Sequence, residues 1–334
     1  MRDIICIGAS AGGVEALTQL VKGFAPDLAA SVFVVLHVSA DQPSRLAEIL
    51  DRMSPLRVAV ASDGEEFTQG RIYVAPPDHH LLIEAGHIVI IKGPKENRCR
   101  PAIDPLFRSA AQHYGHRAIG VLLSGMLDDG TAGLWALKRS GGLAIVQDPA
   151  DSIFPAMAVN ALQHVQADYS VPAAELGPLL SKLARHPSAE IQYDAGISEL
   201  TEVENEYAKL NEVPRNRLDA IGRPSSLMCP LCSSLLWQLK EGPRRFRCHS
   251  GHAFAPGALM VEHRELTEQT LAVLMILIDD EVTLSRQVLE TSTDPEQRRV
   301  IAQDLRSSEM RATALRELLP GGVRSPKKVR PSVS

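Results

Sequence analysis

The sequence has few cysteines, few aromatic residues, no excess of positive charge and no long apolar run. Its 334 residues include five cysteines, and aromatic residues make up 4% of a chain that is 45% hydrophobic, as in an ordinary soluble protein. A net charge of -5 argues against a general nucleic-acid binder, which normally shows a basic excess. No run reaches the roughly 18 apolar residues that a membrane span needs, and the N-terminus lacks the pattern of a signal peptide. We therefore expect a cytoplasmic protein, without nucleic-acid binding or membrane insertion.

Up to about residue 185, apolar runs alternate with helical patterns, which predicts an α/β fold with a doubly wound, mostly parallel sheet and flanking helices. Two apolar runs around Ala85 and Gly86 predict an antiparallel hairpin beside that sheet. The other predicted strands are "DIICIG", "SVFVVLH", "LRVAVA", "RIYVAP", "AIGVLLSG" and "LAIVQD". The predicted helices cover residues 12–22, 43–53, 104–115, 130–140 and 155–163.

The rest of the chain divides into four parts. Residues 186–226 are polar and irregular, and we expect a linker with one short helix. Residues 227–256 contain a cluster of cysteines and histidines. Residues 257–319 carry two helical patterns separated by an Asp-Pro pair, which predicts a helical hairpin. Residues 320–334 are rich in proline and basic residues, as in a disordered tail.

The turn after the first predicted strand lacks two features of a dinucleotide site. Ser10 stands between Gly8 and Gly13, where the G-x-G-x-x-G fingerprint has its middle glycine. At the end of the second strand, where an acidic residue would bond the ribose, the chain has His37. The same turn, Gly8 to Gly12, matches G-x-S-x-G, in which small residues allow a tight strand-to-helix turn that exposes a serine hydroxyl. The pattern favours a nucleophilic serine over a nucleotide loop.

A serine hydroxyl is a poor nucleophile without an adjacent base, and that base is usually a histidine held by a third group. Ser10 follows the first predicted strand and His37 closes the second, and the carboxyl ends of parallel strands meet at one edge of a sheet. A later strand is followed by Asp128 and Asp129, either of which could orient the imidazole. Backbone N–H groups at the Ser10 turn and near Met126 are candidates for an oxyanion hole. Together these residues predict a serine hydrolase.

Six stretches within residues 3 to 183 form a familiar series. They read "IGASAGGVEAL", "LHVS", "YVAPPDHHL", "NRCRPAIDPLFRSAA", "GVLLSGMLDDGTAGLWALK" and "GGLAIVQDP". In order and spacing they resemble the catalytic domain of the chemotaxis protein-glutamate methylesterases, the CheB family. The resemblance implies hydrolysis of glutamyl methyl esters on chemoreceptors or another methylated protein, with release of methanol, and deamidation of receptor glutamines. This chemistry needs no cofactor.

Carried over motif by motif, the resemblance gives each site residue a role. The nucleophile falls on Ser10, the base on His37 and the acid on Asp129. The backbone N–H groups of Met126 and Ala11 would form the oxyanion hole.

The sequence departs from the family pattern at three points. Ala11 replaces a threonine, so a hydroxyl near the site is missing. Leu127 replaces a glycine, and its side chain restricts the turn that aims the Met126 N–H. The family's best-known members carry an N-terminal receiver domain, whereas this chain starts at the catalytic domain, so we expect no regulation by phosphorylation in cis.

Cys229 and Cys232 form a C-x-x-C pair, and Cys248 and His252 follow after 15 intervening residues, with His249 as the competing ligand. Thiolates and an imidazole on two turns suit tetrahedral zinc, and an odd cysteine count with one tight cluster favours a metal over disulfides. All four positions would be used, so we expect a structural zinc in a zinc-ribbon-like segment. We also expect this segment and the helices to form a docking or regulatory module that binds a signalling partner through the helices. The alternative to an esterase is a signalling or docking protein that binds through this segment and the helices and is only weakly catalytic.

Overall fold

A computed structural model describes residues 1–40, 43–185, 198–209 and 214–318. The chain forms two compact units, Met1–Met260 and Val261–Ser334. The predicted tail at 320–334 and part of the predicted linker lie outside the described residues. None of the helices in the described ranges is both long and apolar enough to cross a membrane.

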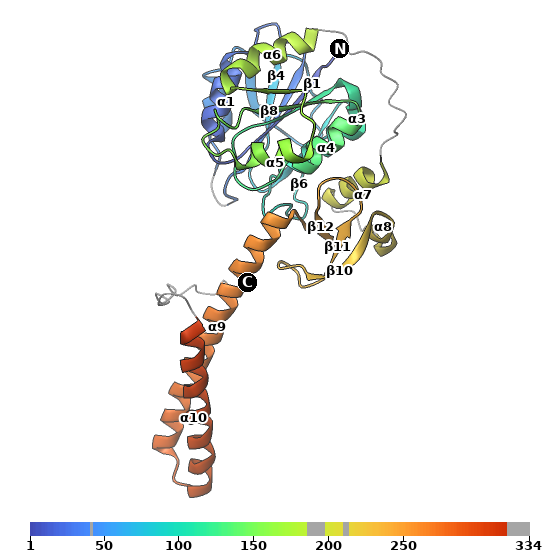
Figure 1. Ribbon diagram of the computed structural model, residues 1–334. Coiled ribbons are helices and arrows are strands. Elements are labelled where there is room, and N and C mark those ends of the chain that lie inside the picture. The colour runs from blue at the N-terminus through green and yellow to red at the C-terminus, as the bar shows by residue number, and fades with distance from the viewer. Residues whose placement is uncertain (41–42, 186–197, 210–213, 319–334) are drawn as a thin grey trace. The chain divides into compact units, whose positions relative to one another are not determined.

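The first unit is built on a seven-stranded sheet in which every pair of neighbouring strands runs parallel. Its strand order is β3-β4-β2-β1-β7-β8-β9, so the chain winds to one side of β1 and then to the other. Figure 1 shows helices around this sheet. The predicted α/β class with a mostly parallel sheet is confirmed. Because the order reverses at β1, the carboxyl end of this strand borders a crevice, where such folds bind their ligands. The strands are β1 (Ile4–Ala9), β2 (Ser31–Leu36), β3 (Arg57–Val60), β4 (Arg71–Val74), β7 (Ala118–Leu122), β8 (Leu143–Gln147) and β9 (Tyr169–Val171).

Helices cover both faces of this sheet, because alternate residues of the central strand point to opposite sides and all are apolar. Ile5 and Ile7 of β1 pack with one set of helices, whereas Ile4 and Cys6 pack with the other. The first set is α1 (Gly13–Lys22), α2 (Leu46–Asp51) and α6 (Ala173–Arg185), and the second is α3 (Ile103–Tyr114), α4 (Thr131–Arg139) and α5 (Ala156–His164). The predicted antiparallel hairpin is formed by β5 (His80–Ile83) and β6 (Ile88–Ile91), and a short 3-10 helix, η1 (Gly115–Arg117), precedes β7.

The predicted linker at 186–226 differs from the structure, which places helices and the start of a strand in its described part. These elements are α7 (Glu199–Ala208), α8 (Arg215–Ile221) and β10 (Gly222–Met228). Among many polar residues, Leu200, Val203 and Tyr207 lie three and four positions apart, so that they share one helix face and pack together in a small core. Three well-spaced apolar residues were enough to form the helix, although the overall composition resembled that of a linker.

A four-stranded antiparallel sheet follows, which we call the Cys/His module (residues 222–255). It consists of β10 and the strands β11 (Leu235–Leu239), β12 (Phe246–Cys248) and β13 (Ala253–Phe254). Its small core includes the buried Cys229, Cys248 and Phe254. The module belongs to the same compact unit as the parallel sheet.

Two long helices, α9 (Pro256–Thr291) and α10 (Pro295–Leu318), contain most of the predicted hairpin. Within the second unit, ion pairs join Arg286 to Glu309 and Arg316 to Asp279, as in an antiparallel pair of helices. Ile278 is buried in this unit.

Candidate active site

Ser10 lies at the carboxyl end of β1, on the turn that leads into α1. Its N–H donates to the carbonyl of Ser124 at 2.9 Å, which ties the turn to the end of β7. Gly12 adopts φ +70°, a conformation that glycine accepts without strain. A Cβ on Gly8 would lie 2.3 Å from a methyl carbon of Ile103, so this position also requires glycine. The small residues of the G-x-S-x-G pattern therefore allow both the turn and the close approach of α3.

His37 follows β2 directly and lies between Ser10 and Asp129. Its Nδ1 is 3.0 Å from the Ser10 Oγ, and its Nε2 is 2.7 Å from the Asp129 Oδ2. A carboxylate only accepts hydrogen bonds. In the neutral imidazole, we therefore assign the ring proton to Nε2, which donates to Asp129 and leaves Nδ1 to accept the Ser10 hydroxyl proton.

Asp129 is buried beneath the imidazole, between β7 and α4. Its Oδ2 also accepts the N–H of Ile103 at 2.7 Å, the first residue of α3, so the positive end of the helix dipole faces the carboxylate. Its Oδ1 accepts from the Asn97 Nδ2 at 2.9 Å. Burial raises the pKa of Asp129, but the hydrogen bond and charge of His37 and the other donors lower it to about 2.

Asp128, the other carboxylate that the sequence left open, has a different environment. Burial and the neighbouring Asp129 raise the pKa of Asp128 to about 6, and its carboxylate accepts the N–H of Gly257. Of the two, Asp129 is the one that hydrogen-bonds to His37.

The thiol of Cys99 also hydrogen-bonds to His37, which the sequence analysis did not anticipate. Burial alone lowers the pKa of His37, but electrostatic interactions and hydrogen bonds with Cys99 and Asp129 raise it to about 10. The imidazole therefore holds its proton more tightly than an ordinary histidine.

The two expected oxyanion donors belong to adjacent turns. Within the described residues, the N–H groups of Ala11 and Met126 donate no hydrogen bond, so both remain available to a ligand. Leu127 adopts φ +63°, the left-handed conformation that favours glycine. Its carbonyl accepts from the Asn160 Nδ2 at 2.6 Å, which holds the turn in this conformation.

Other residues that support the site were not anticipated from the sequence. Ser124 donates its hydroxyl to the Ala11 carbonyl at 2.8 Å, and its own N–H donates to the Gln147 side chain at 2.9 Å. Asn97 contacts Asp129 from a loop distant in sequence. The only available signal for Asn97 was its place in "NRCRPAID", beside the predicted start of a helix.

A second site lies in the Cys/His module. The ligand atoms of Cys229, Cys232, Cys248 and His252 all lie within 4.8 Å of one another. The Cys232 and Cys248 sulfurs are 3.6 Å apart, and the His252 Nδ1 is 3.7 Å from the Cys229 sulfur and 3.5 Å from that of Cys248. Hydrogen bonding from Cys229 and the nearby His252 lowers the pKa of Cys248, which favours the thiolate form that binds metals. The competing ligand, His249, is not part of this group.

The chain is similar to known proteins over the half that contains Ser10, His37 and Asp129. It is 37% identical over 174 residues to protein-glutamate methylesterase/protein-glutamine glutaminase 2 of Rhodospirillum rubrum, covering 51% of this chain and 48% of that protein. It is 34% identical over 182 residues to a putative protein of the same description from Leptospira interrogans, covering 54% of this chain and 94% of that one. The chain therefore spans about half of the first relative and nearly all of the second.

Among solved structures, the catalytic domain of Thermotoga maritima CheB methylesterase matches with a TM-score of 0.53 at 34% identity, covering 55% of this chain and 99% of that one. The sequence profile of the CheB methylesterase family matches residues 5–180. These residues include the whole Ser10, His37 and Asp129 arrangement, and the chain belongs to the CheB methylesterase family.

Proposed function

We propose that this protein hydrolyses methyl esters of glutamyl side chains, with Ser10 as nucleophile, His37 as general base and Asp129 as the acid that orients the imidazole. The hydrogen-bonded chain from Ser10 through His37 to Asp129, at the carboxyl edge of the sheet, carries the proposal. Hydrolysis by these groups requires water and no cofactor.

In the first half of the reaction, the Ser10 Oγ attacks the ester carbonyl carbon while its proton passes to the His37 Nδ1. The carbonyl oxygen becomes an oxyanion, which the N–H groups of Ala11 and Met126 are placed to stabilise. The tetrahedral intermediate collapses, the bond to the methoxy oxygen breaks, and His37 returns the proton so that methanol leaves. An acyl-enzyme on Ser10 remains.

In the second half, His37 takes a proton from water, and the resulting hydroxide attacks the acyl carbon. The bond to Ser10 breaks, the serine recovers its proton from His37, and a glutamate carboxyl group is released. The same acyl-enzyme forms from a glutamine amide if ammonia leaves instead of methanol. The names of both relatives include this glutaminase activity, which we propose as a second reaction of the same site.

The proposed substrate is a methylated chemoreceptor or another methylated protein, since the names of both relatives specify protein-bound glutamate. We place the reaction in the cytoplasm, where thiols such as those of the Cys/His module stay reduced.

Methanol release from a methylated receptor tests the activity. The wild-type chain is expected to release methanol, and Ser10→Ala is expected to lose about a thousandfold or more of the rate. Ser62→Ala, at an exposed position outside the site, serves as the matched control and should keep the full rate. Equal rates for wild type and Ser10→Ala would contradict the assignment of the nucleophile.

We further propose that Cys229, Cys232, Cys248 and His252 bind one structural zinc ion. Tetrahedral zinc with Zn–S bonds of about 2.3 Å separates two sulfur ligands by about 3.8 Å, close to the 3.6 Å between Cys232 and Cys248. Four protein ligands leave no open position, so the ion would stabilise the module and take no part in the reaction.

Metal analysis of the purified full chain tests this site. We expect one zinc per chain, lost in Cys248→Ser and kept in Cys99→Ser, which removes a cysteine outside the group. A metal-free chain with a disulfide among these cysteines would refute the proposal.

A signalling partner that binds the second unit is a further candidate function. The observation in its favour is the exposure of large apolar residues on α9, among them Val273, Leu277 and Leu284. Large apolar side chains that stay exposed together can mark interaction sites. Binding of the methylated receptor by the full chain and by Leu277→Asp tests it for the receptor as partner, and equal affinity would exclude this face as the docking surface for the receptor.

A further inference from the structure

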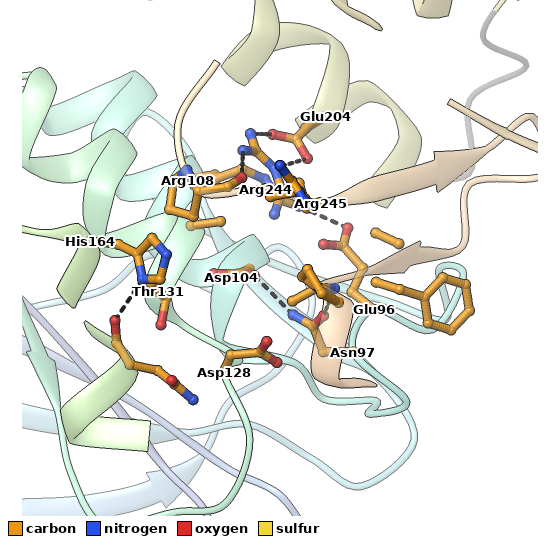
Figure 2. Close-up of a pocket in the computed structure, with 17 residues that line it drawn as sticks. Glu96, Asn97, Asp104, Arg108, Asp128, Thr131, His164, Glu204, Arg244 and Arg245 are labelled. Atoms are coloured by element: carbon orange, nitrogen blue, oxygen red, sulfur yellow. Dashed lines mark hydrogen bonds and ion pairs between the residues drawn. The ribbon is translucent and has the colours of Figure 1, made fainter. Parts of the chain in front are cut away.

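Asn97 lies between two buried carboxylates. Its Nδ2 donates to the Asp129 Oδ1 at 2.9 Å and to the Asp104 Oδ2 at 3.0 Å, and the latter bond is visible in Figure 2. The residue is 6% exposed and adopts φ +47°, a left-handed conformation that asparagine tolerates better than most residues. Its amide group therefore contacts the carboxylate that orients His37.

The amide has a chemical role that a carboxylate cannot take. Asp104 is buried beside Asp129, and burial together with the charge of Asp129 raises the pKa of Asp104 well above its usual range. A neutral group with two N–H donors satisfies both side chains at once, whereas an aspartate at position 97 would place a second negative charge beside Asp129 and donate no hydrogen bond to it. Asn97 thus fixes the Asp129 oxygen that does not face His37.

The Cys/His module holds Asn97 in this position. The N–H of Ala255 donates to the Asn97 Oδ1 at 2.8 Å, and the Asn97 N–H donates to the carbonyl of Ala253 at 2.8 Å. These partners follow directly after the proposed metal ligand His252. Residues 252–255, which include strand β13, therefore carry both a proposed metal ligand and the groups that bind Asn97.

A buried network of charges attaches the same loop to the module. Glu96, next to Asn97, pairs with Arg108 of α3 at 2.7 Å and with Arg247 of β12 at 3.1 Å. Glu204 of α7 pairs with Arg247 and with Arg245. Because an unpaired buried charge is costly, this network specifies how the module docks on the loop.

Packing alone does not lock the amide. A cavity of about 220 Å³ lies beside Asn97, and its lining includes Asp104, Asp128 and Thr131 (Figure 2). Because there is space on this side, hydrogen bonds to the module and to the two carboxylates determine the orientation of the amide.

We propose that Asn97 is a positioning residue of the esterase reaction, and that the metal-loaded Cys/His module holds it against Asp129, so that metal occupancy sets the rate. The inference rests on the proposed hydrolase and zinc functions. It assigns to the module a role in the reaction at a site that it does not line.

The first test replaces the amide by a carboxylate of the same size. Asn97→Asp keeps the acceptor for Ala255 and tolerates the left-handed backbone, but it loses the donor to Asp129. We expect kcat for a small ester such as p-nitrophenyl acetate to fall about 10- to 100-fold, because the imidazole is no longer held in line. KM is expected to stay unchanged, because Asn97 does not contact the ester. An unchanged kcat would overturn the proposal, and so would a loss confined to KM.

The second test removes the metal from the full chain with 1,10-phenanthroline and restores it with Zn²⁺. We expect wild-type kcat to fall reversibly by a similar factor, whereas Asn97→Gly starts low and falls no further, since it has no side chain for the module to hold. A fall of equal factor in both chains would show that the module acts on the fold and not through Asn97. Wild-type kcat unchanged after complete metal removal would also overturn the proposal.

Circular dichroism reports whether the metal-free chain stays folded. If the metal-free chain unfolds, the kcat of Asn97→Asp in the metal-loaded chain decides the proposal. A wild-type chain without esterase activity would instead refute the proposed function, and a wild-type chain that holds no metal would refute the proposed zinc site.

Discussion

At the scale of single residues, the environment of His37 determines when the proposed base can work. A general base must be neutral to accept a proton. Burial lowers the pKa of His37, but Cys99 and Asp129 raise it to about 10, above the ordinary 6.5. At neutral pH the imidazole is therefore mostly protonated in the free protein, and its reactive form accumulates as the pH rises.

This predicts an alkaline shift of the pH profile. We expect kcat/KM for ester hydrolysis to rise with pH, with a midpoint well above 6.5. Cys99→Ser removes a group that raises the pKa of His37, so its midpoint should move to lower pH. The measurement is kcat/KM for p-nitrophenyl acetate as a function of pH, with Ser62→Ala as the control that should match wild type. Identical midpoints for wild type and Cys99→Ser would contradict the role given to the thiol.

The sequence could predict the strand-end residues of the site but not the groups around them. Ser10 and His37 each end an apolar run, and the parallel fold brings such ends to one edge, so their proximity follows from pattern alone. Asn97 and Cys99 lie in a loop without periodicity, and their contacts depend on how that loop folds back over α3. The choice between Asp128 and Asp129 also required the resemblance or the structure, because adjacent residues point in different directions. The catalytic roles of all three residues stay predictions until the variants are assayed.

At the scale of elements, the turn between β7 and α4 combines a proposed oxyanion donor with a left-handed residue. Leu127 takes φ +63° where the family pattern has glycine, and Met126 precedes it. Leu127 keeps the left-handed conformation although a leucine side chain disfavours it. Interactions of the rest of the turn therefore offset the conformational free energy that Leu127 costs.

We expect Leu127→Gly to be more stable than Leu127→Ala by about 1 kcal/mol, because both remove the side chain but only glycine adopts this φ without strain. In an ordinary helix the order would be reversed. The free energy of unfolding in urea gives the comparison. A more stable alanine variant would mean that the turn changes its backbone conformation when the side chain is lost.

The elements themselves follow from sequence to different degrees. Most strands of the parallel sheet are apolar runs, and the long helices have apolar residues at regular spacing, so both were predictable. Strand β9 has only three residues, of which Tyr169 and Ser170 are exposed, and it was not predicted. Within residues 186–226 the sequence predicted one short helix without placing it, whereas the structure has α7 and α8 there. The apolar face of α7 is narrow and packs with residues that come later in the chain. The strands of the Cys/His module are short, and their pairing depends on the two turns that carry the proposed ligands.

At the scale of the whole molecule, buried ion pairs make the module part of the first unit. Glu96 and Arg108 come from the CheB-like half, Glu204 from α7, and Arg245 and Arg247 from the module. All five side chains are almost completely buried. The unit that contains the active site therefore extends well beyond the residues that match the family profile.

Breaking this network is expected to be costly. Glu204→Ala leaves Arg245 and Arg247 without a shared partner and should lower the free energy of unfolding by about 3–5 kcal/mol. Glu309→Ala breaks the exposed pair with Arg286 and should cost less than about 1 kcal/mol. Urea unfolding of both variants checks the contrast, and a similar small loss in both would show that the buried pairs do not hold the module.

The hydrogen bond from Ala255 to Asn97 joins residues 158 positions apart in the chain. Ser10, His37 and Asp129 have all been synthesised by residue 129, whereas Ala255 follows 126 residues later. At about 5–20 residues per second, the ribosome needs roughly 6–25 s for that interval. During this time the nascent chain contains its triad without the group that holds Asn97. If the inference about Asn97 is correct, an unfinished chain is a poor esterase, and full activity appears only after the module is complete and has bound its metal.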